Sequence, residues 1–97
     1  MATYVLLATY TEQGIRGIKD TVSRAATVKE LAGKSGVNMR ETYWTLGQFD
    51  VVALLEAPDD ETMTAFSLSV AKLGNVKTQT LRAFSSQEMS GITGKLV

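Results

Sequence analysis

Apolar and polar positions along the chain divide it into six segments with two different periods. Four segments are rich in β-branched, aromatic and aliphatic residues, and either alternate in polarity or run apolar throughout, as β-strands do: residues 3–10, 37–46, 49–57 and 75–84. Two segments repeat apolar residues every three or four positions and therefore predict helices: residues 20–35 and 58–73. The predicted order of elements is β-α-β-β-α-β.

Turn and cap residues set the predicted boundaries. Gly36 and Gly74 follow the two helical runs, where a left-handed cap residue favours glycine. Gly47 and Gln48 separate two strand-like runs and predict a two-residue type II′ hairpin turn. Pro58 followed by three acidic residues is typical of a helix start, because acidic side chains bind the free amides of the first turn.

Two segments predict little regular structure. Gly14 and Gly17 lower the helix propensity after the first strand and predict a short turn there. Residues 85–97 contain few apolar anchors, so we expect a short turn near 87–90 and a tail that packs on a neighbour or frays. The prediction is a single domain over residues 1–97, with a core at 3–84 and a C-terminal tail at 85–97.

The order of elements predicts an α+β, ferredoxin-like fold with an antiparallel sheet and both helices on one face. Right-handed crossovers place residues 3–10 and 49–57 in the two central strands. Both strands are apolar on both faces, although the helices can cover only one. We therefore expect the second face to meet the same face of a second copy, in a homodimer resembling a barrel. The alternative is that the tail folds over it.

Charge and composition exclude several classes of function. Ten basic and ten acidic residues cancel and form no basic stripe, so nucleic acid is not a predicted partner. The chain has no cysteine and no histidine, which removes thiolate chemistry and the commonest metal ligand and general base. No metal site and no cofactor are predicted. The N-terminal apolar run lacks a basic flank, and no apolar run approaches the ~20 residues of a membrane helix. A cytoplasmic protein without a membrane partner is expected.

Asp50 is the candidate catalytic residue, because a carboxylate at the start of an apolar strand must be hydrogen-bonded, ion-paired or functional. The structural alternative is that Asp50 accepts backbone amide hydrogen bonds or pairs with Arg24 or Arg82.

A small-molecule pocket between sheet and helices is the second prediction. Its expected ligand-binding residues are Tyr4, Arg24, Tyr43, Trp44 and Asp50. The aromatic residues have an alternative role in the core or in an interface, because they bury large areas there. Arg24 has the alternative of an ion-paired or solvated side chain. In the segment 37–46, simple alternation places Met39 with Tyr43, on the side opposite Trp44.

The hairpin segment carries a resemblance to a known family. Residues 47–50 read Gly-Gln-Phe-Asp and continue into VVALLEAPDDE, and the later strand reads VKTQTLRAF. With the order of elements, this resembles the GYD domain family of the dimeric α/β-barrel superfamily, over residues 3–84. Phe49 stands where the signature has tyrosine, so a mechanism that needs this phenol is not available. The resemblance implies fold and dimer, and the family brings no settled activity.

Relatives in that superfamily include cofactor-free monooxygenases, haem-degrading oxygenases and small-ligand regulatory domains. The absence of histidine disfavours the haem enzymes, which use it as an iron ligand. The prediction is a dimeric protein that binds a small molecule in the pocket. One alternative is a cofactor-independent enzyme, monooxygenase- or isomerase-like, with Asp50 as proton acceptor; another is a purely structural oligomer.

Overall fold

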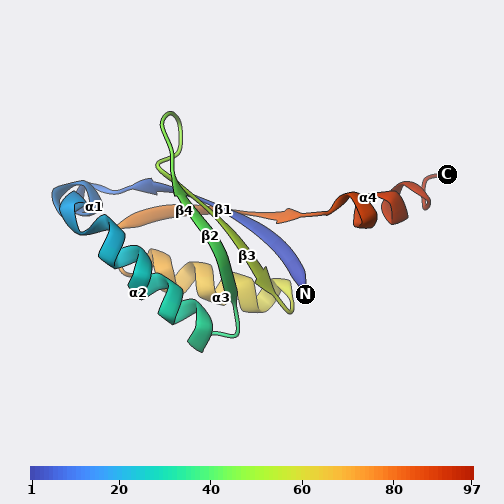
Figure 1. The fold of residues 1–97 in the computed structure, drawn as a ribbon, viewed down its shortest axis with the longest axis horizontal. Helices are drawn as coiled ribbons and strands as arrows, with labels where there is room; N and C mark the ends of the chain where they lie inside the picture. The colour runs from blue at the N-terminus through green and yellow to red at the C-terminus, as the bar shows by residue number, and fades with distance from the viewer.

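The computed structural model describes residues 1–97 and shows four strands and four α-helices (Figure 1). In chain order the elements are β1 (Ala2–Tyr10), α1 (Glu12–Arg16), the short 3₁₀ turn η1 (Ile18–Asp20), α2 (Thr21–Lys34), β2 (Asn38–Trp44), β3 (Val51–Ala57), α3 (Asp60–Ala71), β4 (Val76–Ala83) and α4 (Ser86–Thr93). None of the helices is long and apolar enough to cross a membrane.

The strands form one antiparallel sheet in the order β2-β3-β1-β4. The two apolar strands β1 and β3 are central, and α2 and α3 lie on the same side of the sheet (Figure 1). This confirms the predicted α+β, ferredoxin-like fold. The core lies between the helices and the inner sheet face, and its largest fully buried side chains are Leu55, Met63 and Phe66.

The predicted helix boundaries have clear local causes. The Asp59 side chain accepts a hydrogen bond from the Thr62 amide at 2.8 Å and so caps α3. Hydrogen bonding by Thr62, first through its side chain and then through its amide, lowers the pKa of the Asp59 carboxyl. Gly36 and Gly74 follow α2 and α3 with φ of +79° and +88°, a conformation that other residues rarely adopt. Gly36 and Gly74 therefore have the left-handed conformation expected of glycines that follow the two long helices.

The predicted two-residue hairpin turn is wrong. Strand β2 ends at Trp44 and β3 begins at Val51, so six residues connect them. The Thr45 amide donates to the Asp50 carbonyl at 2.9 Å, which closes a longer loop around Gly47. Gly47 does adopt a positive φ, as a turn glycine should, but within this longer loop.

A β-bulge at Arg40 changes which side chains of β2 share a face. Met39 pairs with Leu55 and Glu41 pairs with Leu54. Two steps along β2 therefore correspond to one step along β3, and Arg40 is the extra residue. Met39 therefore lies on the same inner face as Trp44. The simple alternation that placed it with Tyr43 is wrong.

The segment after β1 is more regular than predicted. The Thr11 hydroxyl accepts a hydrogen bond from the Gly14 amide at 3.1 Å and caps the short helix α1. Gly14 is buried against the α3–β4 connection, where an added Cβ would lie 2.1 Å from the Asn75 carbonyl oxygen. Glycine is required here by the close approach of two backbone segments.

The outer sheet face has an apolar centre that no helix covers. We call it the open face, and its residues pair across the strands: Val5, Leu7, Tyr43, Val52, Leu54 and Leu81. The four residues from β1 and β3 are half-buried, and those from the outer strands are exposed. Both faces of the central strands are thus apolar, but only the inner one is packed within the chain.

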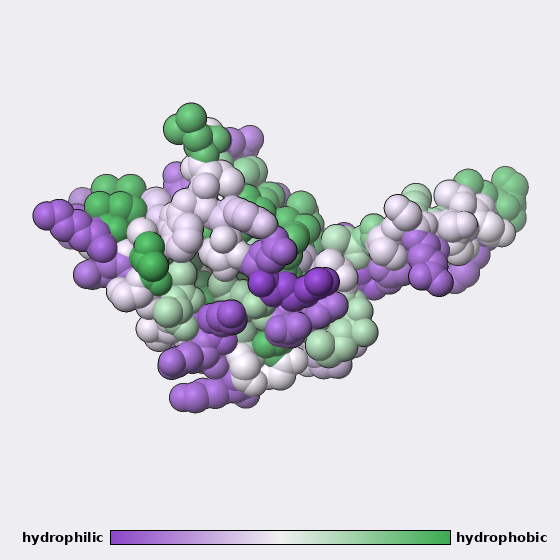
Figure 2. Space-filling model, viewed as in Figure 1, coloured by the Kyte–Doolittle hydropathy of each residue, from purple (hydrophilic) through white to green (hydrophobic).

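The tail forms a helix instead of the single turn predicted near 87–90. Ser85 and Glu88 form a reciprocal capping box that starts α4. Glu88 Oε2 also lies 3.5 Å from Arg82 Nη2, in an ion pair. Helix α4 contains no buried residue and projects away from the sheet (Figures 1 and 2). The tail therefore does not take up the alternative position over the open face.

Candidate ligand cavity

A cavity of about 290 Å³ lies between the inner sheet face and helices α2 and α3. Of its 18 lining residues, 13 are hydrophobic: Leu6, Ala8, Tyr10, Ala25, Val28, Met39, Trp44, Val51, Ala53, Phe66, Val70, Leu73 and Val76. The others are Thr21, Arg24, Thr27, Thr42 and Asn75. The cavity therefore has an apolar body with few polar groups, which is the usual composition of a small-molecule site.

Helix α2 lines the cavity with a stripe of helical spacing. Thr21, Arg24, Ala25 and Val28 follow one another at intervals of three, one and three residues, which puts them on one side of the helix. Alanines stand at the facing sheet positions Ala8 and Ala53, as well as at Ala25. Because alanine side chains are short, they leave space between helix and sheet that larger residues would fill.

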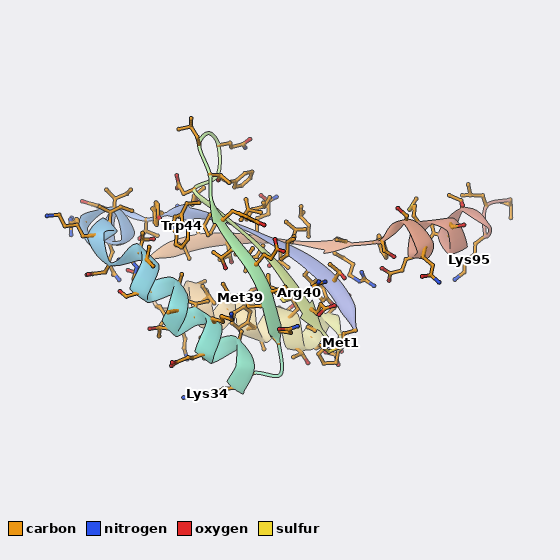
Figure 3. All side chains as sticks on the ribbon, in the orientation of Figure 1. Met1, Lys34, Met39, Arg40, Trp44 and Lys95 are labelled. Atoms are coloured by element: carbon orange, nitrogen blue, oxygen red, sulfur yellow. The ribbon has the colours of Figure 1, made fainter.

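A shared hydroxyl group joins helix α2 and the sheet in the cavity lining. The Thr21 hydroxyl lies 2.8 Å from the Tyr10 hydroxyl and accepts a hydrogen bond from the Trp44 indole at 3.0 Å. Trp44 and Met39 both come from β2, which runs beside α2 (Figure 3). This contact holds the aromatic wall of the cavity against α2.

Arg24 is the only charged residue in the lining. Its half-buried guanidinium donates hydrogen bonds to the carbonyl oxygens of Gly17 and Gly14, the latter at 3.2 Å. The ion pairs of the protein involve other arginines, namely Arg16, Arg40 and Arg82. Arg24 therefore faces two neutral carbonyl groups and no carboxylate.

Asp50 lies outside the cavity lining. Its carboxylate accepts a hydrogen bond from the Tyr10 amide at 2.9 Å, and its own amide donates to the Ala8 carbonyl at 2.9 Å. Asp50 thereby continues the pairing of β1 and β3 beyond Val51. Asp50 thus accepts a hydrogen bond from a backbone amide, as the structural alternative to a catalytic role describes.

The other two predicted ligand residues also lie away from the cavity. Tyr4 is buried and donates a hydrogen bond to the Asp60 carboxylate at 2.6 Å; burial, followed by this hydrogen bond, raises the pKa of Tyr4 to about 12. Tyr43 is on the open face and hydrogen-bonds Glu41, which raises the pKa of the Tyr43 phenol. The structure thus brings Arg24 and Trp44 together at the cavity, and places Tyr4, Tyr43 and Asp50 elsewhere.

Several lining residues were not singled out from the sequence. Thr21 carried a usable signal, since it stands one helical turn before Arg24 on the same stripe. Phe66 lies in the helical segment predicted over residues 58–73, and its buried side chain also lines the cavity. Met39 could not be found by alternation, because the bulge at Arg40 changes its face. Tyr43 and Trp44 are consecutive in a strand, so only one of them can reach the inner face.

Comparisons with known proteins place this architecture in a family. A Thermus thermophilus protein named "Glutamine synthetase and cystathionine beta-lyase binding protein" is 36% identical over 84 residues, covering 86% of this chain and 88% of that protein. The fold is similar to that of TTHA0845, also from Thermus thermophilus, with a TM-score of 0.59 at 24% identity, covering 89% of this chain and 96% of that one.

Two further solved structures share the fold at lower identity. FFRP-DM1 has a TM-score of 0.63 at 17% identity, covering 87% of this chain and 100% of that one. The protein PHS023 from Pyrococcus horikoshii has a TM-score of 0.57 at 18% identity, covering 89% and 93%. The model of the GYD domain matches residues 4–93, which extends the resemblance seen in the sequence through α4. The chain belongs to the GYD domain family.

Proposed function

We propose that this protein is a homodimeric binding protein that holds a small molecule in the cavity of each copy. The observation that carries the proposal is the cavity itself, about 290 Å³ and mainly apolar, between α2, α3 and the sheet. Its volume is near the lower end of small-molecule sites, roughly 300 Å³, and favours a compact ligand.

The lining favours binding over proton-transfer catalysis. It contains no Asp or Glu, and the chain has no histidine or cysteine, so no general base of these types faces a bound molecule. The carboxylate of Asp50, the residue assigned to the enzyme alternative, is held by the Tyr10 amide outside the lining.

The open face supports the dimer. Its apolar and aromatic residues come from all four strands, and α4 points away from it. Exposed apolar patches of this kind mark interfaces, and a domain of 97 residues gains stability from added burial. A second copy is the proposed occupant, since the formal net charge of zero sets up no overall repulsion between copies.

Trp44 provides the test of the cavity because it lines the cavity and is the only tryptophan. We expect octanoate or its neutral analogue octanamide to change Trp44 fluorescence in a saturable way. The variant Ala25→Leu fills the cavity from α2 and should abolish this change. Ala65→Leu makes the same substitution at an exposed position of α3 outside the lining, and should bind as the wild type does.

Two results would contradict the cavity proposal. One is the absence of a saturable signal with both compounds. The other is binding that survives in Ala25→Leu while the protein remains folded, which would place the bound molecule elsewhere.

Protein binding is a second candidate function, favoured by the name of the Thermus thermophilus relative. On this proposal the protein binds glutamine synthetase or cystathionine beta-lyase. Purified copies of these two enzymes, taken from the same source as this protein, provide the test by light scattering of mixtures. A complex whose mass rises to a saturating value supports it, and unchanged masses for both enzymes contradict it.

A further inference from the structure

The charge inside the cavity lining is unbalanced. Arg24 is half-buried, is the only charged lining residue, and forms none of the ion pairs in the protein. Partly desolvated charges are normally paired, because removal from water without a counter-charge is unfavourable. The two backbone carbonyls that accept from Arg24 satisfy hydrogen bonds and carry partial negative charge, but neither carries a formal charge that balances the guanidinium.

The guanidinium also retains hydrogen-bonding capacity. It has five N–H donors, and its two acceptors are the carbonyl groups of Gly14 and Gly17. The planar arrangement of these donors suits a carboxylate, which accepts two parallel hydrogen bonds. Hydroxyl groups of Thr21 and Thr27 also line the cavity and add neutral polar groups.

We propose that the ligand is a small apolar monocarboxylate, with its carboxylate at Arg24 and its apolar body against Val28, Met39 and Phe66. This inference rests on the proposed binding function and adds the chemical class of the ligand. A single cation balances one negative charge, which disfavours phosphate dianions. Cationic ligands find no acidic residue in the lining.

The test compares octanoate with octanamide, which have nearly the same shape and differ in charge at pH 7. Titrations monitored by Trp44 fluorescence should give octanoate an affinity on the order of tenfold higher, as expected for a hydrogen bond between charged groups. Raising the NaCl concentration should weaken octanoate binding and leave octanamide binding unchanged, since salt screens only the charged pair.

The variant Arg24→Gln assigns the difference to one side chain. We expect the variant to bind octanoate about tenfold more weakly than the wild type does. Its affinity for octanamide should equal that of the wild type, so the two compounds should bind the variant equally well. Lys34→Gln is the matched control, because it removes one positive charge from an exposed position near the end of the same helix. It should preserve the preference for octanoate.

The results separate this inference from the proposed function. Equal affinities of octanoate and octanamide for the wild-type protein would overturn the carboxylate assignment and leave the cavity as a binding site. Failure of both compounds to bind would overturn the binding function itself. The comparison on the wild-type protein needs no variant, so it decides the question even if the loss of the two carbonyl contacts unfolds Arg24→Gln.

Discussion

At the scale of single residues, Asp50 shows how a carboxylate can be explained by backbone pairing. Strand β3 begins at Val51, yet the amide of Tyr10 in β1 still needs an acceptor beyond that point. The Asp50 side chain supplies it at 2.9 Å, while the Asp50 amide binds the Ala8 carbonyl. Asp50 thereby forms the last hydrogen bonds between the ends of β1 and β3.

Two substitutions at Asp50 test this structural role. Asp50→Ala removes the acceptor and should lower the free energy of unfolding by about 1.5–3 kcal/mol, the usual contribution of a hydrogen bond to a charged group. Asp50→Asn keeps a carbonyl oxygen as acceptor and should cost less. Urea unfolding of the three proteins measures both. Equal destabilisation by the Asn and Ala variants would show that the hydrogen bond from the Tyr10 amide is not what Asp50 contributes to stability.

At the scale of elements, two glycines in helices have opposite reasons to be there. Gly14 in α1 leaves no room for a Cβ, which would lie 2.1 Å from the Asn75 oxygen. A Cβ added at Gly33 in α2 would meet no atom within 4 Å outside its own helix backbone. We expect Gly14→Ala to destabilise the protein by about 1–3 kcal/mol through overpacking. Gly33→Ala should stabilise it by roughly 0.5–1 kcal/mol, as alanine does in an open helix position.

Thermal or urea unfolding of the two alanine variants checks the pair directly. Helix propensity alone predicts the same sign for both. A stabilised Gly14→Ala would therefore mean that α1 and the α3–β4 connection do not approach each other as closely as Gly14 and Asn75 indicate.

The same elements show what could be predicted from the sequence. The four strands and the two long helices follow from periodicity and caps such as Asp59 and Gly74, because these signals are local. The six-residue loop around Gly47 and the bulge at Arg40 depend on pairing across strands, which periodicity does not record. The full cavity lining could not be predicted for the same reason, because the bulge places Met39 on the inner face.

At the scale of the whole molecule, the open face and the cavity use opposite sides of one sheet. Along β1, Val5 and Leu7 contribute to the open face, while Leu6 and Ala8 line the cavity. The proposed dimer would cover the first set and leave the helix side of each copy unobstructed. Self-association and ligand binding can therefore be changed separately by substitution on alternate residues of a strand.

The dimer is tested by placing one charge on the open face. Wild-type protein should have the mass of two 10.5 kDa chains by light scattering, and Leu54→Glu should have the mass of one. The reason is that two copies would each bury an unpaired carboxylate at a two-fold interface, which is strongly unfavourable. Leu68→Glu is the matched control, since Leu68 lies on α3 and is already 65% exposed.

The control should remain dimeric, and circular dichroism should show an intact sheet in both variants. Because the cavity lies on the other face, monomeric Leu54→Glu should still bind octanoate with wild-type affinity. A wild-type protein that is monomeric at micromolar concentration would contradict the dimer. A dimer that persists in Leu54→Glu would place the contact on another surface, with α4, which projects from the body of the molecule, as the next segment to examine.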